Sequence, residues 1–172
     1  MKKTRKQQFF QYFEKLAPKY SKYRKRFRYY WKDIISYFNY FINANDSVLE
    51  IGCGTGDTLQ KIKGNRKVGI DFSPNMIEEA RKLYPGIDFR VMEAENIVLD
   101  EQFDVVILSN VVGYFENVLD VLNSMKKVCK EDTRILISYY NFLWEPVIKF
   151  GEIVGIKKKC ARQNWLSISD IN

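Results

Sequence analysis

Three glycines spaced two apart, Gly52, Gly54 and Gly56, are the residues whose types and spacing point most directly to chemistry. They follow a short apolar run that ends in an acid, Glu50. Glycine adopts positive φ easily and lets a bound molecule approach the backbone closely. The pattern is typical of a buried strand that turns sharply beside a nucleotide-like ligand. We expect a short helix over residues 57–63, with its first N–H groups facing an anionic group of that ligand.

A second acid, Asp71, ends the apolar strand predicted over residues 67–71 and stands 17 positions after Gly54. In doubly wound sheets an acid at this place hydrogen-bonds the ribose hydroxyls of a nucleoside. Ser73 and Pro74 then open a helix, the serine as N-cap and the proline as first helical residue. Together these features predict a site for a ligand that contains a nucleoside.

The order of these motifs closely resembles that of the class I S-adenosylmethionine-dependent methyltransferases. The resemblance spans about residues 45–140 and rests on four stretches, Glu50–Gly56, Val68–Met76, Met92–Glu95 and Phe103–Asn110. It implies S-adenosylmethionine as the cofactor and direct in-line transfer of a methyl group to an acceptor. It also implies a set of cofactor-binding residues: Glu50, Gly52, Cys53, Gly54, Gly56, Asp71, Phe72, Met76, Glu93, Ala94, Ser109 and Asn110.

Within that set, the resemblance gives the glycine loop to the methionine part of the cofactor and Asp71 to the ribose. Phe72 and Met76 would flank the adenine, and Glu93 would accept a hydrogen bond from its amino group. Ser109 and Asn110, at the end of a strand, would lie beside the transferred methyl group. The segment from Phe13 to Tyr20 corresponds to a lid over the cofactor.

No side chain is assigned with certainty to catalysis, and Tyr114 and Tyr20 are the candidates. The family often has His or Tyr at the position of Tyr114, where it could orient an acceptor or assist deprotonation. An ordinary tyrosine pKa near 10 makes it a weak base, so packing on the cofactor is the alternative role. Residues expected to line the acceptor pocket are Tyr20, Tyr114, Tyr140, Trp144 and Trp165.

The chain has no histidine, which excludes Ser–His and Cys–His hydrolases and removes the commonest general base and metal ligand. Its three cysteines are widely spaced, and no metal site is predicted. Methyl transfer from a sulfonium donor tolerates these absences, because it needs mainly positioning and exclusion of water. The acceptor is expected to be a small molecule or a lipid- or sugar-linked intermediate.

Two alternatives remain open from the sequence. A dinucleotide-binding domain needs Gly-x-Gly-x-x-Gly, but the third position of that pattern is Asp57, which would repel a pyrophosphate. A truncated or divergent domain that binds the cofactor or a partner protein without catalysis is the second. The Asn/Asp-Pro-Pro-Tyr signature of amino-N-methyltransferases is absent, which disfavours DNA bases and glutamine amides as acceptors.

Charge is very unevenly distributed. Residues 1–32 hold 12 Lys or Arg and a single acid, while the whole 172-residue chain has a net charge of +7. We therefore interpret residues 1–43 as a basic aromatic helical arm or lid, with a helix break near Pro18. The arm could also bind an anionic membrane surface or nucleic acid. No apolar run is long enough to span a bilayer, and we expect a cytoplasmic protein, peripheral to a membrane if the arm binds one.

The rest of the chain, residues 44–172, alternates strands and helices and predicts an α/β, doubly wound, mostly parallel sheet of Rossmann-like methyltransferase type. We expect the strand order 3-2-1-4-5, with the ligand at the carboxyl ends of strands 1 and 4. The final strands of that fold are not found, so self-association through an open sheet edge is a further expectation. The expected strands are 47–51, 67–71, 88–92, 103–109 and 134–140, and the expected helices are 57–63, 74–84, 117–130 and an amphipathic one over 146–155.

Overall fold

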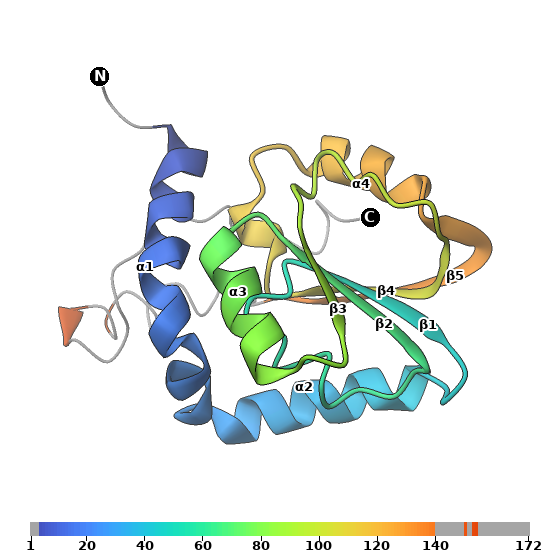
Figure 1. Ribbon diagram of the computed structural model, residues 1–172, viewed down its shortest axis with the longest axis horizontal. Helices are drawn as coiled ribbons and strands as arrows, with labels where there is room; N and C mark the ends of the chain where they lie inside the picture. The colour runs from blue at the N-terminus through green and yellow to red at the C-terminus, as the bar shows by residue number, and fades with distance from the viewer. Residues whose placement is uncertain (1–3, 140–149, 151–152, 155–172) are drawn as a thin grey trace.

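The computed structural model describes residues 4–139, 150 and 153–154, and in these ranges it contains one five-stranded parallel sheet. The strand order is β3-β2-β1-β4-β5, with helices on both faces (Figure 1). This confirms the predicted doubly wound fold and its strand order. The strands are β1 (Ser47–Ile51), β2 (Arg66–Asp71), β3 (Asp88–Val91), β4 (Phe103–Ser109) and β5 (Cys129–Ser138).

Alternate apolar side chains of each strand pack into two separate layers, one on each face of the sheet. Leu49 and Ile51 of β1 face the layer covered by α4 (Val118–Lys126), and Val48 faces the layer covered by α2 (Arg28–Phe41) and α3 (Pro74–Leu83). Side chains of a strand point alternately to opposite faces, so one strand contributes to both layers. Because helices bury both faces, the carboxyl ends of the strands are the exposed edge at which a site can form.

The first helix, α1 (Arg5–Lys25), packs against α3 beside this edge (Figure 1). The predicted helix break at Pro18 is wrong, because α1 continues through it. Proline has no N–H to donate to the carbonyl four residues earlier, which belongs to Glu14. In the structure the side-chain amide of Asn75 donates to that carbonyl at 3.3 Å. A neighbouring helix thus satisfies the acceptor that proline leaves without a helical partner.

The helix predicted over residues 57–63 is also wrong, because this segment forms a series of turns. The carboxylate of Asp57, at its start, accepts hydrogen bonds from Thr55, Ser21 and Tyr84. Its oxygens are therefore engaged by side chains of α1 and of the loop after α3, and they do not cap a helix.

The helix predicted over 117–130 ends at Lys126, and the strand predicted from residue 134 begins at Cys129 as β5. An irregularity in the β4–β5 register explains the difference, because Thr133 accepts from the N–H of Lys130 and donates to the carbonyl of Phe103. The helix predicted at 74–84 is α3, and Ser73 is its N-cap with Pro74 in the first turn, as predicted. Most of the amphipathic helix predicted at 146–155 lies outside the described residues.

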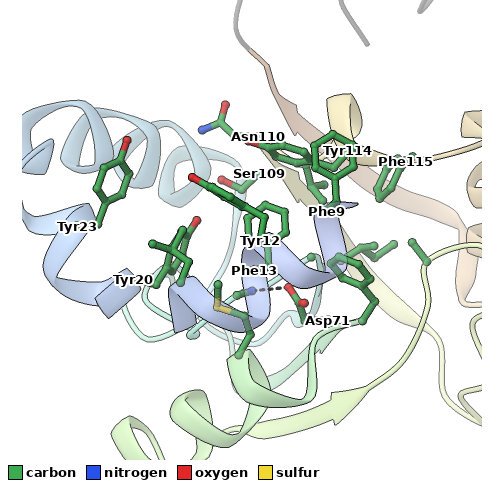
Figure 2. A pocket seen from close by; sticks show the side chains of 18 of the residues that line it. Phe9, Tyr12, Phe13, Tyr20, Tyr23, Asp71, Ser109, Asn110, Tyr114 and Phe115 are labelled. Carbon is green, nitrogen blue, oxygen red and sulfur yellow. Dashed lines mark hydrogen bonds between the residues drawn. The ribbon is translucent and has the colours of Figure 1, made fainter. Parts of the chain in front are cut away.

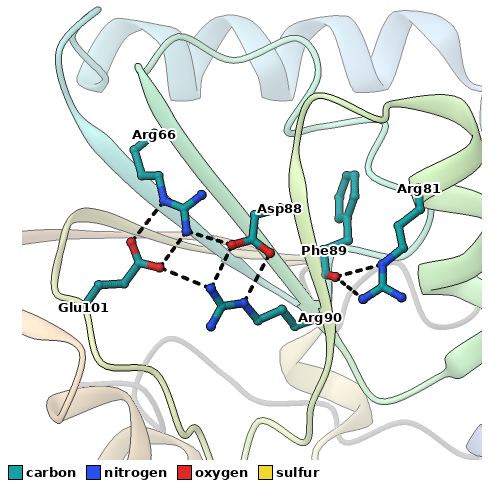
Figure 3. A network of polar contacts seen from close by, with 6 residues as sticks. All are labelled: Arg66, Arg81, Asp88, Phe89, Arg90 and Glu101. Atoms are coloured by element: carbon teal, nitrogen blue, oxygen red, sulfur yellow. Dashed lines mark hydrogen bonds and ion pairs between the residues drawn. The ribbon is translucent and has the colours of Figure 1, made fainter.

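An ion-pair network braces the sheet at the end opposite the loops that follow the strands (Figure 3). Arg66 bridges Asp88 and Glu101, each at 2.7 Å, and Arg90 lies 2.8 Å from Asp88. These side chains join the starts of β2 and β3 to the segment before β4. In the described ranges, no helix is both long and apolar enough to cross a membrane.

Candidate functional site

A cavity of about 660 Å³ lies between α1 and the carboxyl ends of the central strands (Figure 2). This volume is within the range of sites for small molecules and cofactors. The strand ends and the loops after them contribute Ile51, Gly52, Gly54, Asp71, Ser109 and Asn110. The opposite wall is aromatic and includes Phe9, Tyr12, Phe13, Tyr20, Tyr23, Phe27, Tyr30 and Trp31.

The glycine turn after β1 lines this cavity with exposed backbone. Gly52 and Gly54 have φ of 72° and 54°, a conformation that L side chains rarely adopt. A Cβ at Gly52 would lie 2.3 Å from Cγ2 of Val111, and a Cβ at Gly54 would lie 3.0 Å from Cε1 of Tyr20. The turn therefore needs glycine both for its conformation and for its close neighbours.

Asp71 is buried at the end of β2, where it accepts hydrogen bonds from the backbone N–H groups of Gly54 and Ser73, both at 2.9 Å. Each of these bonds occupies one lone pair of a different carboxylate oxygen. Together they fix the orientation of the carboxylate on the cavity wall. Burial raises the pKa of Asp71 to about 6, although the two N–H donors oppose the shift. A carboxylate oxygen accepts more than one hydrogen bond, so Asp71 can accept from a ligand as well.

Glu50 lies behind the glycine turn and is almost completely buried. Its Oε2 atom has no hydrogen-bond partner among the described residues. Burial raises the pKa of Glu50 to about 8, while the nearby charge of Arg24 and a hydrogen bond from Thr58 lower it. A buried carboxyl with an unsatisfied oxygen is costly, which makes Glu50 a candidate to bind a group that the described residues do not supply.

α1 is attached to the strand-end loops by polar contacts along its length. Near its start, Arg5 donates to the carbonyls of Gly113 and Phe115. In its middle, the carboxylate of Glu14 accepts from Ser73 at 2.5 Å and from the N–H of Asn75 at 3.0 Å. These contacts hold α1 over the cavity.

Arg24, at the far end of α1, is a functional candidate that the sequence did not reveal. It is buried, donates to Thr58 at 3.0 Å and stacks over the ring of Trp31, with its Cζ 3.6 Å from the ring centroid. The sequence shows Arg24 as one of 12 basic residues in the first 32. Only the fold distinguishes it, since its basic neighbours Lys25 and Arg26 are exposed.

The two tyrosines considered for catalysis have different surroundings. Tyr20 packs on Gly54, and burial raises its pKa to about 12, so even less of it is deprotonated near neutral pH than of a free tyrosine. Tyr114 makes edge-to-face contacts with Phe9 and Phe13, with ring centroids 5.0 and 5.1 Å apart. Both geometries favour the packing role over proton transfer.

Asn110, the residue after β4, has a left-handed backbone with φ of 54°. Its side chain is hydrogen-bonded to the hydroxyl of Tyr30, with Nδ2 at 2.8 Å and Oδ1 at 3.0 Å. The side chain of Ser109, one residue earlier, lies 3.4 Å from the hydroxyl of Ser138. A residue of α2 therefore helps to orient a polar group at the carboxyl end of β4.

The structure brings most of the predicted site residues to this one cavity. Glu93 instead pairs with Lys6 and is half-exposed, and its neighbour Glu95 lies on the cavity wall. Whether any of them contacts a ligand remains a prediction. Those on the wall are Gly52, Gly54, Asp71, Phe72, Met76, Ala94, Ser109, Asn110, Tyr20 and Tyr114; Glu50, Cys53 and Gly56 are not among the lining residues, and Tyr140, Trp144 and Trp165 lie outside the described residues.

Metal ligands are not grouped in the part of the chain that the structure describes. No three Cys, Asp or Glu side chains there are placed to hold a metal ion. The thiol of Cys53 is buried, and burial raises its pKa well above the ordinary value.

Comparison with known proteins gives a consistent family. The family described as "Methyltransferase domain" matches residues 42–167. A protein of Invertebrate iridescent virus 6 that carries a provisional methyltransferase name is 29% identical over 128 residues, which cover 72% of this chain and 46% of the viral protein. Demethylmenaquinone methyltransferase of Chlorobaculum parvum is 36% identical over 87 residues, covering 48% of this chain and 36% of that enzyme.

Similarity to solved structures extends to the arm. A SAM-dependent methyltransferase from Thermotoga maritima has a TM-score of 0.74 at 22% identity, covering 94% of this chain and 76% of that one. This shows a shared fold. The chain spans less than half the length of the two curated relatives that it matches above.

Proposed function

Since the chain belongs to the methyltransferase-domain family, whose cofactor is S-adenosylmethionine, we propose that the cavity under α1 binds this cofactor and is the site of methyl transfer. The observation that carries the proposal is the position of Gly52, Gly54 and Asp71 together on the cavity wall. Left-handed glycines allow close approach of a ligand, and the carboxylate beside them can accept hydrogen bonds from ribose hydroxyls.

The residues present fit such a ligand at both of its polar ends. Asp71 is fixed by two backbone N–H groups and retains acceptor capacity for hydroxyls. Glu50, which lies behind the glycine turn and not on the cavity wall itself, has a buried oxygen without a partner in the described ranges, near the place proposed for the ammonium group of the methionine end. Phe72 and Met76, which follow Asp71 in the chain and line the cavity, supply an apolar wall for the purine ring.

The bound cofactor supplies an activated methyl group on a sulfonium sulfur. The chain supplies position and a water-poor site, and both favour an in-line displacement. Asn110, held by Tyr30, presents a fixed amide at the end of β4. Tyr20 covers Gly54 and Tyr114 covers the neighbouring wall with rings that exclude water. No described side chain is placed as a strong base, and the proposal therefore favours an acceptor that is nucleophilic without one.

We assign the acceptor to neutral, apolar molecules, which include aromatic and lipid-linked compounds. Aromatic side chains form most of the wall that faces the strand ends. Lys6 is the cation that lines the cavity among the described residues. It is paired with Glu93 at 2.9 Å and lies 3.7 Å from Glu95. An acceptor with several negative charges would lose its hydration there without gaining a free cation.

Calorimetric titration with S-adenosylhomocysteine and, separately, with NAD tests cofactor choice. We expect a one-to-one complex with S-adenosylhomocysteine and no complex with NAD. A folded chain that binds neither, or that prefers NAD, would contradict the proposal.

Acceptor class is tested with labelled S-adenosylmethionine and two compounds of similar size, a neutral hydroxylated naphthoquinone and a tricarboxylate. Transfer is expected only to the neutral compound. Preferential methylation of the tricarboxylate would overturn the acceptor assignment while leaving the cofactor assignment intact.

A further inference from the structure

The turn between α1 and α2 carries an unusual group of exposed side chains, which we call the α1–α2 corner. Five consecutive residues, Lys25 to Tyr29, are all exposed. Lys22 precedes them by one helical turn, and Lys32 lies one turn after Arg28. The corner comprises Lys22, Lys25, Arg26, Phe27, Arg28, Tyr29 and Lys32.

The positive charge of this corner is not neutralised within the described part of the chain. None of its five cations takes part in an ion pair there. The acid of α1, Glu14, hydrogen-bonds to Ser73 and to the N–H of Asn75 and so points away from the corner. The acid of α2, Asp33, forms no ion pair with the described residues. Such a cationic surface attracts an extended anionic partner.

The corner also exposes large aromatic side chains. Phe27 is 38% exposed and Tyr29 is 70% exposed, and Arg28 stacks over the Tyr29 ring with its Cζ 4.9 Å from the centroid. Aromatic rings beside Lys and Arg are the composition that favours the boundary between lipid headgroups and acyl chains. Arginine and lysine can remain at the headgroups while the rings enter the apolar layer.

Phe27 connects this surface with the cavity, because it is both exposed and one of the cavity-lining residues. Tyr23, one turn earlier on α1, lines the cavity as well and lies 5.4 Å from Phe27 between ring centroids. The aromatic wall therefore continues from the interior to the corner. An apolar molecule could move between a lipid layer and the cavity along this wall without crossing bulk water.

We propose that the α1–α2 corner docks the protein on an anionic lipid membrane, with Phe27 and Tyr29 inserted among the headgroups and the cations against lipid phosphates. Continuity with an apolar cavity favours a membrane over nucleic acid. A polynucleotide that extended from the corner into the cavity would bring phosphates toward the aromatic wall. The cation described on that wall, Lys6, is already paired with Glu93. Docking is independent of the proposed methyl transfer, although it would bring a lipid-linked acceptor to the cavity.

Vesicle flotation with the full chain tests the proposal. Vesicles of phosphatidylcholine are compared with vesicles that also contain phosphatidylglycerol, at low and high salt. We expect binding only when phosphatidylglycerol is present and a loss of binding at high salt, because surface charge is screened.

The charge contribution is measured with the triple variant Lys25→Gln, Arg26→Gln and Arg28→Gln. Each cation near an anionic membrane contributes about five-fold in partitioning, so the triple variant should bind roughly a hundred-fold more weakly. The matched control is Lys61→Gln, Lys126→Gln and Lys127→Gln, which removes the same charge from exposed sites elsewhere and should change binding much less. The insertion step is measured with Phe27→Ala and Tyr29→Ala, which keep the charge of the corner and should still lower binding to the phosphatidylglycerol vesicles at low salt.

Equal binding to both vesicle types, or equal weakening by the corner and control variants, would overturn the proposal. A single-stranded RNA oligonucleotide is titrated under the same conditions. Tighter binding to RNA than to the vesicles, abolished by the corner variant, would assign the surface to nucleic acid instead. Calorimetry with S-adenosylhomocysteine on the triple charge variant separates this outcome from the proposed cofactor site, since Lys25, Arg26 and Arg28 do not line the cavity and their substitution should leave cofactor affinity intact.

Discussion

Asp71 and Gly54 are joined by a hydrogen bond of 2.9 Å, from the backbone N–H of the glycine to Oδ2 of the aspartate. The acid that ends β2 therefore holds the turn that follows β1. One carboxylate thus shapes the glycine loop and presents oxygens to the cavity, so its substitution should affect the ligand more than the sheet.

We expect Asp71→Asn to weaken S-adenosylhomocysteine binding by roughly 1–3 kcal/mol, the cost of losing a charged hydrogen-bond acceptor. The amide oxygen of asparagine can still accept from the N–H of Gly54, whereas its NH2 group replaces the oxygen that accepts from Ser73, so circular dichroism is used to check that the variant stays folded. Calorimetry gives the affinity, and Asp100→Asn, an exposed acid, is the control. Equal affinities for the two variants would place the ligand away from Asp71.

Gly54→Ala should lower both stability and cofactor affinity. At φ of 54° an L residue is strained by about 1–2 kcal/mol, and the new methyl group would press on the ring of Tyr20, part of the cavity wall. Gly64→Ala is a matched control, because Gly64 also has positive φ, at 112°, but is not among the lining residues. It should lower stability alone. If both variants reduce affinity equally, the effect comes from general strain and not from the cavity.

Arg24→Met should speed dissociation of bound S-adenosylhomocysteine by about ten-fold. The change removes a hydrogen bond to Thr58 made by a charged donor, which is worth about 1.5–3 kcal/mol, and it removes the stacking on Trp31. Stopped-flow fluorescence can follow the reaction through that indole. Arg26→Met, on the exposed side of the same turn, should leave the rate unchanged. An unchanged rate in the Arg24 variant would show that the end of α1 does not retain the ligand.

The buried Glu50 should make the ligand-free protein less stable as the pH rises. Burial raises its folded pKa to about 8, above the ordinary value of 4.5. Between these values the unfolded chain binds fewer protons than the folded chain, so stability falls by up to about 1.4 kcal/mol per pH unit. In urea unfolding, Glu50→Gln should flatten this slope between pH 6 and 8, above the raised pKa of Asp71, whereas Glu131→Gln, an exposed control, should keep it. A slope that survives between pH 6 and 8 in Glu50→Gln would contradict the assignment.

The opposite pH dependence is expected at Asp88. Hydrogen bonds from Arg90 and Arg66 lower its folded pKa to about 2 from an ordinary 3.8. This stabilisation is present above pH 3.8 and is lost as the pH falls toward 2. Asp88→Asn should therefore cost about 1 kcal/mol near pH 7, given that its partners are partly exposed, and clearly less near pH 2, where about half of the folded carboxyls are protonated. Urea midpoints at both pH values test this, and an equal cost at both would rule out the charge as its source.

Strand positions were predictable because buried parallel strands are short apolar runs that end at acidic, polar or glycine residues. Residues 103–109 were predicted to the residue as β4, and Asp71 ends β2 as expected. Such strands are buried on both faces, so they are almost continuously apolar, and this pattern can be recognised in the sequence alone. The same strand ends could be expected to line one cavity, because parallel strands present their carboxyl ends at one edge, and the predicted residues on that wall are the basis of the proposed cofactor site.

The remaining features depend on distant contacts. Pro18 is compatible with α1 because Asn75, 57 positions away, donates to the carbonyl of Glu14. The turns at residues 57–63 follow from the side chains that reach Asp57 from α1 and from the loop after α3. The role of Arg24 depends in the same way on Thr58 and Trp31. A local pattern contains none of this information.

The cavity wall is divided between two parts of the chain, with consequences for how its specificity can change. The family match begins at residue 42, just after α2, whereas much of the aromatic wall comes from α1 and α2. Under the proposed function, substitutions in these helices would change which acceptor fits the cavity while the glycine turn and Asp71 keep the methyl donor in place. Chimaeras in which residues 1–41 are exchanged between relatives would then differ in acceptor and share the donor.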